Sequence, residues 1–179
     1  MINLKDYNIE LHLVRHGSYT PTKVGGWTDD GLNTEGVSQI KDLFSKIDDN
    51  YDLFISSSLE RAKESALILN EKLNMNILYN DNFREIDCGI LNNMPVEEFM
   101  TKYSKDYFNT LGPDDSFPEG ESQNSFLTRI SDEFMKLLEE ERNKKILLVT
   151  HSGVIYVILY LLGISDVNVE TGSIIKLNQ

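Results

Sequence analysis

The segment KILLVTHSG, residues 145–153, decides the fold class, because four apolar residues in a row, Ile146 to Val149, are followed at once by polar ones. Such a continuous run is typical of a central parallel strand that is buried on both faces. The segment IELHLVRHG, residues 9–17, is a second strand candidate, and it also ends in a histidine followed by glycine. Both segments therefore predict strands of a parallel sheet.

Short apolar runs alternate with longer segments of helical period on both sides of these strands. Further strands are expected at 52–56, 77–79 and 172–177, and helices at about 34–47, 59–73, 96–103, 123–141 and 152–162. Residues suited to capping helix starts are Asn33 or Thr34, Ser57 or Ser58, Ser122 and Ser152. The alternation predicts an α/β fold, a three-layer α/β/α sandwich around a mostly parallel sheet, with residues 1–179 forming a single domain.

Composition and charge restrict the partners. The chain has 17 basic and 29 acidic side chains, a formal charge of −12, and 40% apolar residues, which are values of a soluble acidic fold. An acidic surface repels nucleic acid backbones, so an anionic ligand must be drawn in by a local cluster of cations. Cys88 is the only cysteine and permits no internal disulfide.

Targeting signals are absent from the sequence as given. No apolar run reaches the roughly 18 residues of a membrane span, and residues 1–10 contain no apolar signal core. We therefore expect a cytoplasmic protein that binds neither membranes nor nucleic acid, while the oligomeric state is left open.

His16 and His151 each come directly after a predicted strand. Ligands of open parallel sheets bind beyond the carboxyl ends of the strands, so both imidazoles face one crevice if these strands are neighbours. Arg15, beside His16, adds a cation suited to an anionic ligand. His12 lies within the first strand and is interpreted as structural.

Five segments in order resemble the motifs of the histidine phosphatase superfamily. They are Arg15 to Gly17, Ser56 to Ala62, Arg84 to Gly89, Pro118 to Ser122 and Val149 to Gly153. They extend over nearly the whole chain, and five ordered motifs are far more specific than one three-residue match. The resemblance implies a phosphoglycerate mutase-like fold. It also implies that His16 is the nucleophile, that Glu85 is the general acid, and that the phosphate is surrounded by Arg15, Arg61 and His151.

These residue types suit phosphoryl transfer. A neutral imidazole nitrogen can attack phosphorus, provided that a hydrogen bond to the other ring nitrogen selects the tautomer. Guanidinium groups bind phosphate oxygens bidentately, and a carboxyl group can protonate the departing alkoxide. No metal or other cofactor is required, and the sequence shows no His-Glu-x-x-His or paired-cysteine motif.

Other residues of the motifs are candidates for contacts with the substrate. Ser122 and Ser152, besides capping helices, are placed to present backbone amides to phosphate. Gly26 and Trp27 lie in a segment, 25–29, that resembles the family's substrate-side loop, although an ordinary loop would look the same. An alternative for Glu85 is an ion pair with its neighbour Arg84. Two positions depart from the family pattern: Ser18, where Glu or Gln is usual, and Thr22, where Asn is common.

The leading hypothesis is a metal-independent phosphomonoesterase that hydrolyses a small phosphorylated metabolite through a phosphohistidine. The compact chain resembles alpha-ribazole phosphatases, whereas residues 85–90 and 94–98 also resemble fructose-2,6-bisphosphatase domains, so alpha-ribazole phosphate and a sugar phosphate are both candidates. The rival is a phosphoglycerate mutase, but family mutases carry a longer basic insertion, and here only Lys102 and Lys105 lie between Arg84 and Arg129. A non-catalytic phospholigand-binding regulatory module is the hypothesis of another class, and the full catalytic set disfavours it.

Overall fold

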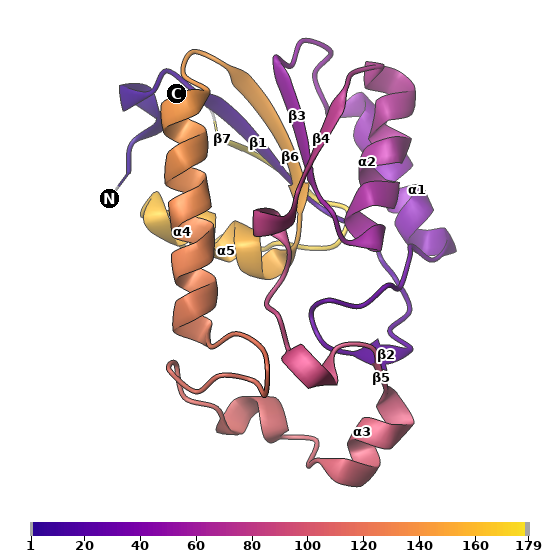
Figure 1. Cartoon of the computed structure of the whole chain (residues 1–179). Coiled ribbons are helices and arrows are strands. Elements are labelled where there is room, and N and C mark those ends of the chain that lie inside the picture. The colour runs from indigo at the N-terminus through magenta and orange to yellow at the C-terminus, as the bar shows by residue number, and fades with distance from the viewer. Residues whose placement is uncertain (1, 178–179) are drawn as a thin grey trace.

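A computed structural model of the chain describes residues 2–177 and shows a five-stranded sheet between two pairs of helices (Figure 1). The strand order is β4-β3-β6-β1-β7, and every pair is parallel except β1 with β7. The predicted mostly parallel sheet is therefore confirmed. The strands are Glu10–Arg15 (β1), Leu53–Ser57 (β3), Ile77–Asn80 (β4), Lys145–Thr150 (β6) and Ile174–Leu177 (β7).

β1 and β6 are neighbours near the middle of this sheet, in the register that pairs Arg15 with Thr150. The residues that follow them, His16 and His151, therefore leave the sheet side by side. The backbone N–H of His16 donates to the carbonyl oxygen of Thr150 at 3.0 Å, which extends the pairing by one more residue.

The helices cover both faces of the sheet, as the three-layer prediction requires (Figure 1). One face packs against α1 (Thr34–Asp42) and α2 (Glu60–Leu73), the other against α4 (Gln123–Glu140) and α5 (Ser152–Leu161). Leu147 and Val149 of β6 belong to the apolar core on the side of α1 and α2, whereas Ile146 and Leu148 belong to the core on the side of α4 and α5. All four are fully buried. Burial on both faces explains the unbroken apolar run of this strand.

Two of the predicted helix caps are confirmed. Asn33 accepts a hydrogen bond from the N–H of Gly36 at 2.8 Å and caps α1. Ser122 caps α4 through a reciprocal pair of hydrogen bonds with Ser125. These side chains satisfy backbone donors that the first turn of a helix leaves unpaired.

The other two predicted caps are wrong. Leu59, not Ser57 or Ser58, holds the N-cap position of α2, and no side chain caps that helix. The Ser57 hydroxyl binds His151 instead. Ser152 is already the first residue of α5, and His151 is the N-cap residue there.

The segment between β4 and α4 lies beyond the carboxyl ends of the parallel strands (Figure 1). It has its own apolar cluster, built around Leu91, Phe99 and Phe117. The helix predicted there is present, but the short antiparallel pairing of β2 with β5 was not foreseen. The remaining elements are β2 (Lys23–Val24), β5 (Met94–Pro95), α3 (Val96–Lys102) and the single-turn helices η1 (Leu4–Asp6), η2 (Leu43–Ser45), η3 (Asp81–Phe83), η4 (Gly89–Leu91) and η5 (Tyr107–Thr110).

No helix within residues 2–177 combines the length and the apolar character needed to cross a bilayer.

Candidate active site

His16 is buried at the end of β1, with 3% of its surface exposed. Its Nδ1 lies 2.8 Å from the carbonyl oxygen of Gly17, and its Nε2 lies 3.3 Å from Nε of Arg61. A carbonyl oxygen only accepts and a guanidinium only donates, so both contacts assign the proton to Nδ1 and a lone pair to Nε2. Burial first, and then the Arg61 cation, lower the pKa of His16 to about 3, so the ring is neutral at physiological pH.

His151 faces His16 from the end of β6. The two ring centroids are 5.1 Å apart, and His151 is completely buried. Its Nε2 lies 2.7 Å from the Ser57 hydroxyl, while its Nδ1 is buried with no hydrogen-bond partner among residues 2–177. Burial, followed by the charge of Arg61, holds the pKa of His151 well below its ordinary value.

Arg61 comes from the first turn of α2 and is 3% exposed. Its guanidinium donates to the carbonyl oxygen of Gly26 at 2.8 Å and makes longer contacts with Thr28. Arg15 donates to the carbonyl oxygen of Val169 at 2.8 Å, and its Nε is likewise buried without a partner in the described part of the chain. Buried polar groups are nearly always paired, so the unpartnered Nε of Arg15 and Nδ1 of His151 indicate a site for a polar ligand, and the Arg15 and Arg61 cations favour an anion there.

Glu85 lies across the amino end of α5. One carboxylate oxygen accepts from the backbone N–H of Gly153 at 3.0 Å, and the other from that of Ile86 at 3.1 Å. The alternative ion pair with Arg84 is absent, because Arg84 binds Asp81 at 2.8 Å instead. A Cβ atom added at position 153 would lie 2.2 Å from the Glu85 carboxylate, so this close approach requires glycine.

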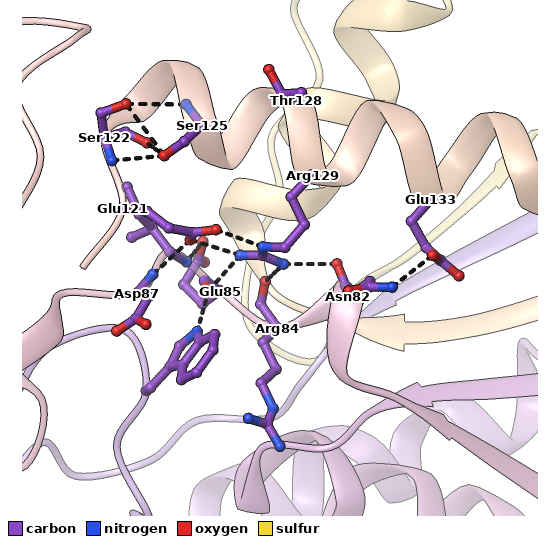
Figure 2. Close-up of polar contacts among 12 residues, drawn as sticks. Asn82, Arg84, Glu85, Asp87, Glu121, Ser122, Ser125, Thr128, Arg129 and Glu133 are labelled. Atoms are coloured by element: carbon purple, nitrogen blue, oxygen red, sulfur yellow. Dashed lines mark hydrogen bonds and ion pairs between the residues drawn. The ribbon is translucent and has the colours of Figure 1, made fainter. Parts of the chain in front are cut away.

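Arg129 fastens the backbone around Glu85, as Figure 2 shows. From α4 it donates to the carbonyl oxygens of Asn82 at 2.7 Å, Arg84 at 3.1 Å and Glu85 at 3.2 Å. Its remaining N–H groups form a two-pronged ion pair with Glu121, at 2.6 and 2.8 Å. One guanidinium thus holds the segment that carries Glu85 through three hydrogen bonds and joins it to Glu121 through the other two.

Sequence reasoning missed Arg129. The available signals were its place on α4 between the buried Phe126 and Ile130, and its distance of eight residues from Glu121 of the Pro118–Ser122 motif. A long cation beside a buried helical stripe suggests a partner in the adjoining loop.

The segment that contains Gly26 and Trp27 is tied to the same loop. The Trp27 indole N–H donates to the carbonyl oxygen of Glu85 at 2.6 Å, and its backbone N–H donates to Asn92 at 3.0 Å. The Arg84 guanidinium lies 4.9 Å from the Trp27 ring centre. The Gly26 carbonyl oxygen also accepts from Arg61, so this loop connects the arginine to the backbone of Glu85 and is not simply a solvent-exposed connection.

The four remaining polar candidates have mainly local roles. Ser18 accepts from Asn33, and the Thr22 hydroxyl donates to Asp30 at 2.8 Å, so both stabilise the loop after β1. The Ser122 hydroxyl is taken by its helix cap. Within residues 2–177, no hydrogen bond links Ser122 or Ser152 to the two histidines or to Arg15 and Arg61.

Potential metal ligands gather at the opposite end of β1. Among the described residues, Glu10, His12 and Asp48 are the one group close enough together to share an ion. The Lys145 ammonium already binds both carboxylates. His12 is fully buried with its Nδ1 2.7 Å from the Tyr51 hydroxyl, which agrees with the structural role predicted for it.

Comparison with known proteins supports the resemblance of the chain to the histidine phosphatase superfamily. The sequence profile of the histidine phosphatase superfamily (branch 1) matches residues 11–176. A Bacillus subtilis (strain 168) protein described as an uncharacterized phosphatase, PhoE, is 33% identical over 151 residues, which cover 82% of this chain and 74% of that protein. Phosphoserine phosphatase 1 of Hydrogenobacter thermophilus is 30% identical over 150 residues, 80% of this chain and 71% of that one.

The fold is also found in solved structures. The alpha-ribazole phosphatase of Shigella flexneri superposes with a TM-score of 0.79 at 23% identity, over 94% of this chain and 90% of that one.

Proposed function

We propose that this chain, which belongs to the histidine phosphatase superfamily (branch 1) and is a phosphatase, hydrolyses a small phosphomonoester through a phosphorylated His16. His16 is the nucleophile, Glu85 is the general acid, and Arg15, Arg61 and His151 bind the phosphate. The observation that carries the proposal is the state of His16: a buried, neutral ring whose Nε2 lone pair lies beside Arg61 and His151.

In the first step, Nε2 of His16 attacks phosphorus while the bond from phosphorus to the ester oxygen breaks. Glu85 gives its proton to the departing oxygen, so the product leaves as an alcohol. The negative charge on the phosphoryl oxygens is stabilised by the guanidiniums of Arg15 and Arg61 and by a hydrogen bond from Nδ1 of His151. The proton of His16 stays on Nδ1 and is donated to the Gly17 carbonyl oxygen. This hydrogen bond stabilises the positive charge that the ring gains as the nitrogen–phosphorus bond forms.

In the second step, the Glu85 carboxylate takes a proton from water, and the oxygen of that water attacks the phosphohistidine. The nitrogen–phosphorus bond breaks, inorganic phosphate is released, and His16 returns to its neutral form. Gly153 supports this cycle, because its N–H stabilises the ionised form of Glu85 between the two steps.

Replacement of His16 by Asn tests the proposal. The variant keeps a donor for the Gly17 carbonyl but has no nucleophilic nitrogen, so hydrolysis of 4-nitrophenyl phosphate should fall by at least about 1,000-fold. Activity near that of the unmodified protein would refute the role of His16. Tight phosphate binding without any turnover would instead favour the non-catalytic module.

Hydrolysis is favoured over mutase activity by the wall of the site. The two lysines of the segment between Glu85 and Ser122 are exposed, and Lys102 is paired with Glu98 at 2.6 Å. These two lysines therefore do not form a positively charged lid that would keep water from the phosphohistidine. Release of inorganic phosphate should therefore far exceed interconversion of 2- and 3-phosphoglycerate, and efficient interconversion would reverse this preference.

A further inference from the structure

A cavity of about 450 Å³ lies between the loop after β1 and the segment that leads into α4. This size lies within the roughly 300–1,000 Å³ of small-molecule sites. We call it the side pocket, and its apolar wall is formed by Val24, Ile86, Cys88, Phe108, Leu111 and Phe117.

The side pocket shares a wall with the phosphate-binding groups. Tyr19 lines it, and the Tyr19 ring centre is 5.6 Å from that of His16 and 5.1 Å from the guanidinium carbon of Arg61. Gly26 also lines it and accepts a hydrogen bond from Arg61. A group esterified to a phosphate held by Arg61 therefore has this cavity as its neighbour.

Among the described residues that line the side pocket, no cation is left without an acidic partner. Of its two charged lining residues, Lys23 binds Asp29 at 2.5 Å, and Asp115 accepts from the backbone N–H of Gly112 at 2.8 Å. The nearby arginines outside the phosphate site are also committed, Arg84 to Asp81 and Arg129 to Glu121. A carboxylate on the substrate would lose its water there without gaining a charged partner.

The aromatic side chains in the wall of the side pocket instead favour a substrate that carries a ring. Phe108 and Phe117 lie with their ring centres 5.4 Å apart, and Phe108 also packs against Phe99 at 5.4 Å. Cys88, whose thiol pKa is raised to about 11 by burial, adds a neutral apolar surface. These tilted rings leave part of their surface facing the side pocket, and aromatic rings stabilise a further ring that packs against them.

We propose that the side pocket binds the alcohol part of the substrate and selects uncharged, ring-bearing phosphomonoesters against small carboxylated ones. This inference rests on the proposed function, since it assigns the substrate class of the same reaction. Phe108 and Leu111 are its specificity-determining residues, and they act on binding of the alcohol, not on the transfer to His16.

Three primary alkyl phosphates test the selection: 2-phenylethyl phosphate, ethyl phosphate and 3-phosphoglycerate. Their reacting groups are similar, so differences in kcat/KM report on the side pocket. We expect kcat/KM for the phenylethyl ester to exceed that for the ethyl ester by about tenfold or more, with 3-phosphoglycerate the poorest of the three.

Variants locate the selection. Phe108→Ala should lower kcat/KM for the phenylethyl ester about tenfold more than that for the ethyl ester. Met100→Ala is the matched control, because Met100 is 53% exposed in the same segment and does not line the side pocket. Gln123→Arg disturbs no packed ring, and the cation that it adds to the side pocket should raise kcat/KM for 3-phosphoglycerate at least about tenfold.

Equal kcat/KM for the three esters, with His16 still required, would overturn the substrate class but leave the hydrolysis standing. A loss of the same size for all esters in Phe108→Ala, or no gain in Gln123→Arg, would also count against the side pocket. If the unmodified protein hydrolyses none of the three esters and does not hydrolyse 4-nitrophenyl phosphate either, the proposed function is refuted and this inference with it.

Discussion

The burial of His16 predicts a specific loss of stability in mild acid. Its pKa is about 3 in the folded protein and 6.5 when unfolded, so protonation favours the unfolded chain. The contribution of the neutral ring is intact above pH 6.5 and is lost progressively as the pH falls from 6.5 toward 3. At pH 5 the unfolded ring is almost fully protonated and the folded ring is neutral, which costs about 2 kcal/mol of unfolding free energy.

The assay compares unfolding by urea at pH 7.5 and pH 5 in buffer without phosphate, because a bound anion would stabilise the folded state. His16→Asn removes the titrating ring, so this variant should lose about 2 kcal/mol less than the unmodified protein between the two pH values. Fluorescence of Trp27, the only tryptophan, and circular dichroism should give coincident transitions.

Cys88→Ala is the matched control, since this buried thiol does not titrate between pH 5 and 7.5 and the pH-dependent loss should equal that of the unmodified protein. His151, whose pKa is also lowered, contributes to the loss in all three proteins. If His16→Asn loses as much stability as the unmodified protein, the folded ring is not held neutral and the nucleophile assignment fails.

Three further predictions concern the reaction and the support of Glu85. Glu85→Gln should slow hydrolysis of alkyl phosphates by at least about 100-fold and that of 4-nitrophenyl phosphate far less, because nitrophenolate leaves without a proton. If the steady-state rates for both kinds of substrate fall equally, Glu85 is not the general acid. Arg129→Met should lower the unfolding free energy measured in urea by about 3 kcal/mol, because it leaves Glu121 with a partly buried charge and no partner cation. Adding Glu121→Gln to this variant should restore part of the lost stability. A double variant as unstable as the sum of the two single changes would contradict the ion pair. Vanadate should inhibit competitively in initial-rate assays while chelators have no effect, and activity lost in chelator but restored by a divalent ion would reveal a metal site.

The parts of the fold that local sequence determines were predictable. A run such as Ile146 to Val149 is apolar because both faces of β6 are covered, and the residue after such a strand lies at the ligand-binding edge whatever the loops do. The placement of His16 and His151 at this edge follows from their position after the strands, whereas their meeting also requires that β1 and β6 are neighbours. Their chemical roles stay predictions until the variants are measured.

The features that were missed depend on residues far apart in the chain. Ser57 and Ser58 satisfy the local pattern of a helix cap, but the Ser57 hydroxyl is taken by His151, which arrives from another strand. Arg129 is an ordinary helical arginine until the Glu121 loop folds against it. The side pocket likewise combines the loop after β1 with the segment before α4, and no spacing along the sequence specifies that meeting.

Detection of the phosphorylated residue tests the central claim most directly. The protein is mixed with 4-nitrophenyl phosphate, denatured within milliseconds in alkali, where a nitrogen–phosphorus bond of histidine survives, and digested for peptide mass spectrometry. A phosphoryl group on His16, formed in the unmodified protein and missing in His16→Asn, is the expected result. Rapid turnover with an unmodified His16, or with the phosphoryl group on another residue, would contradict it.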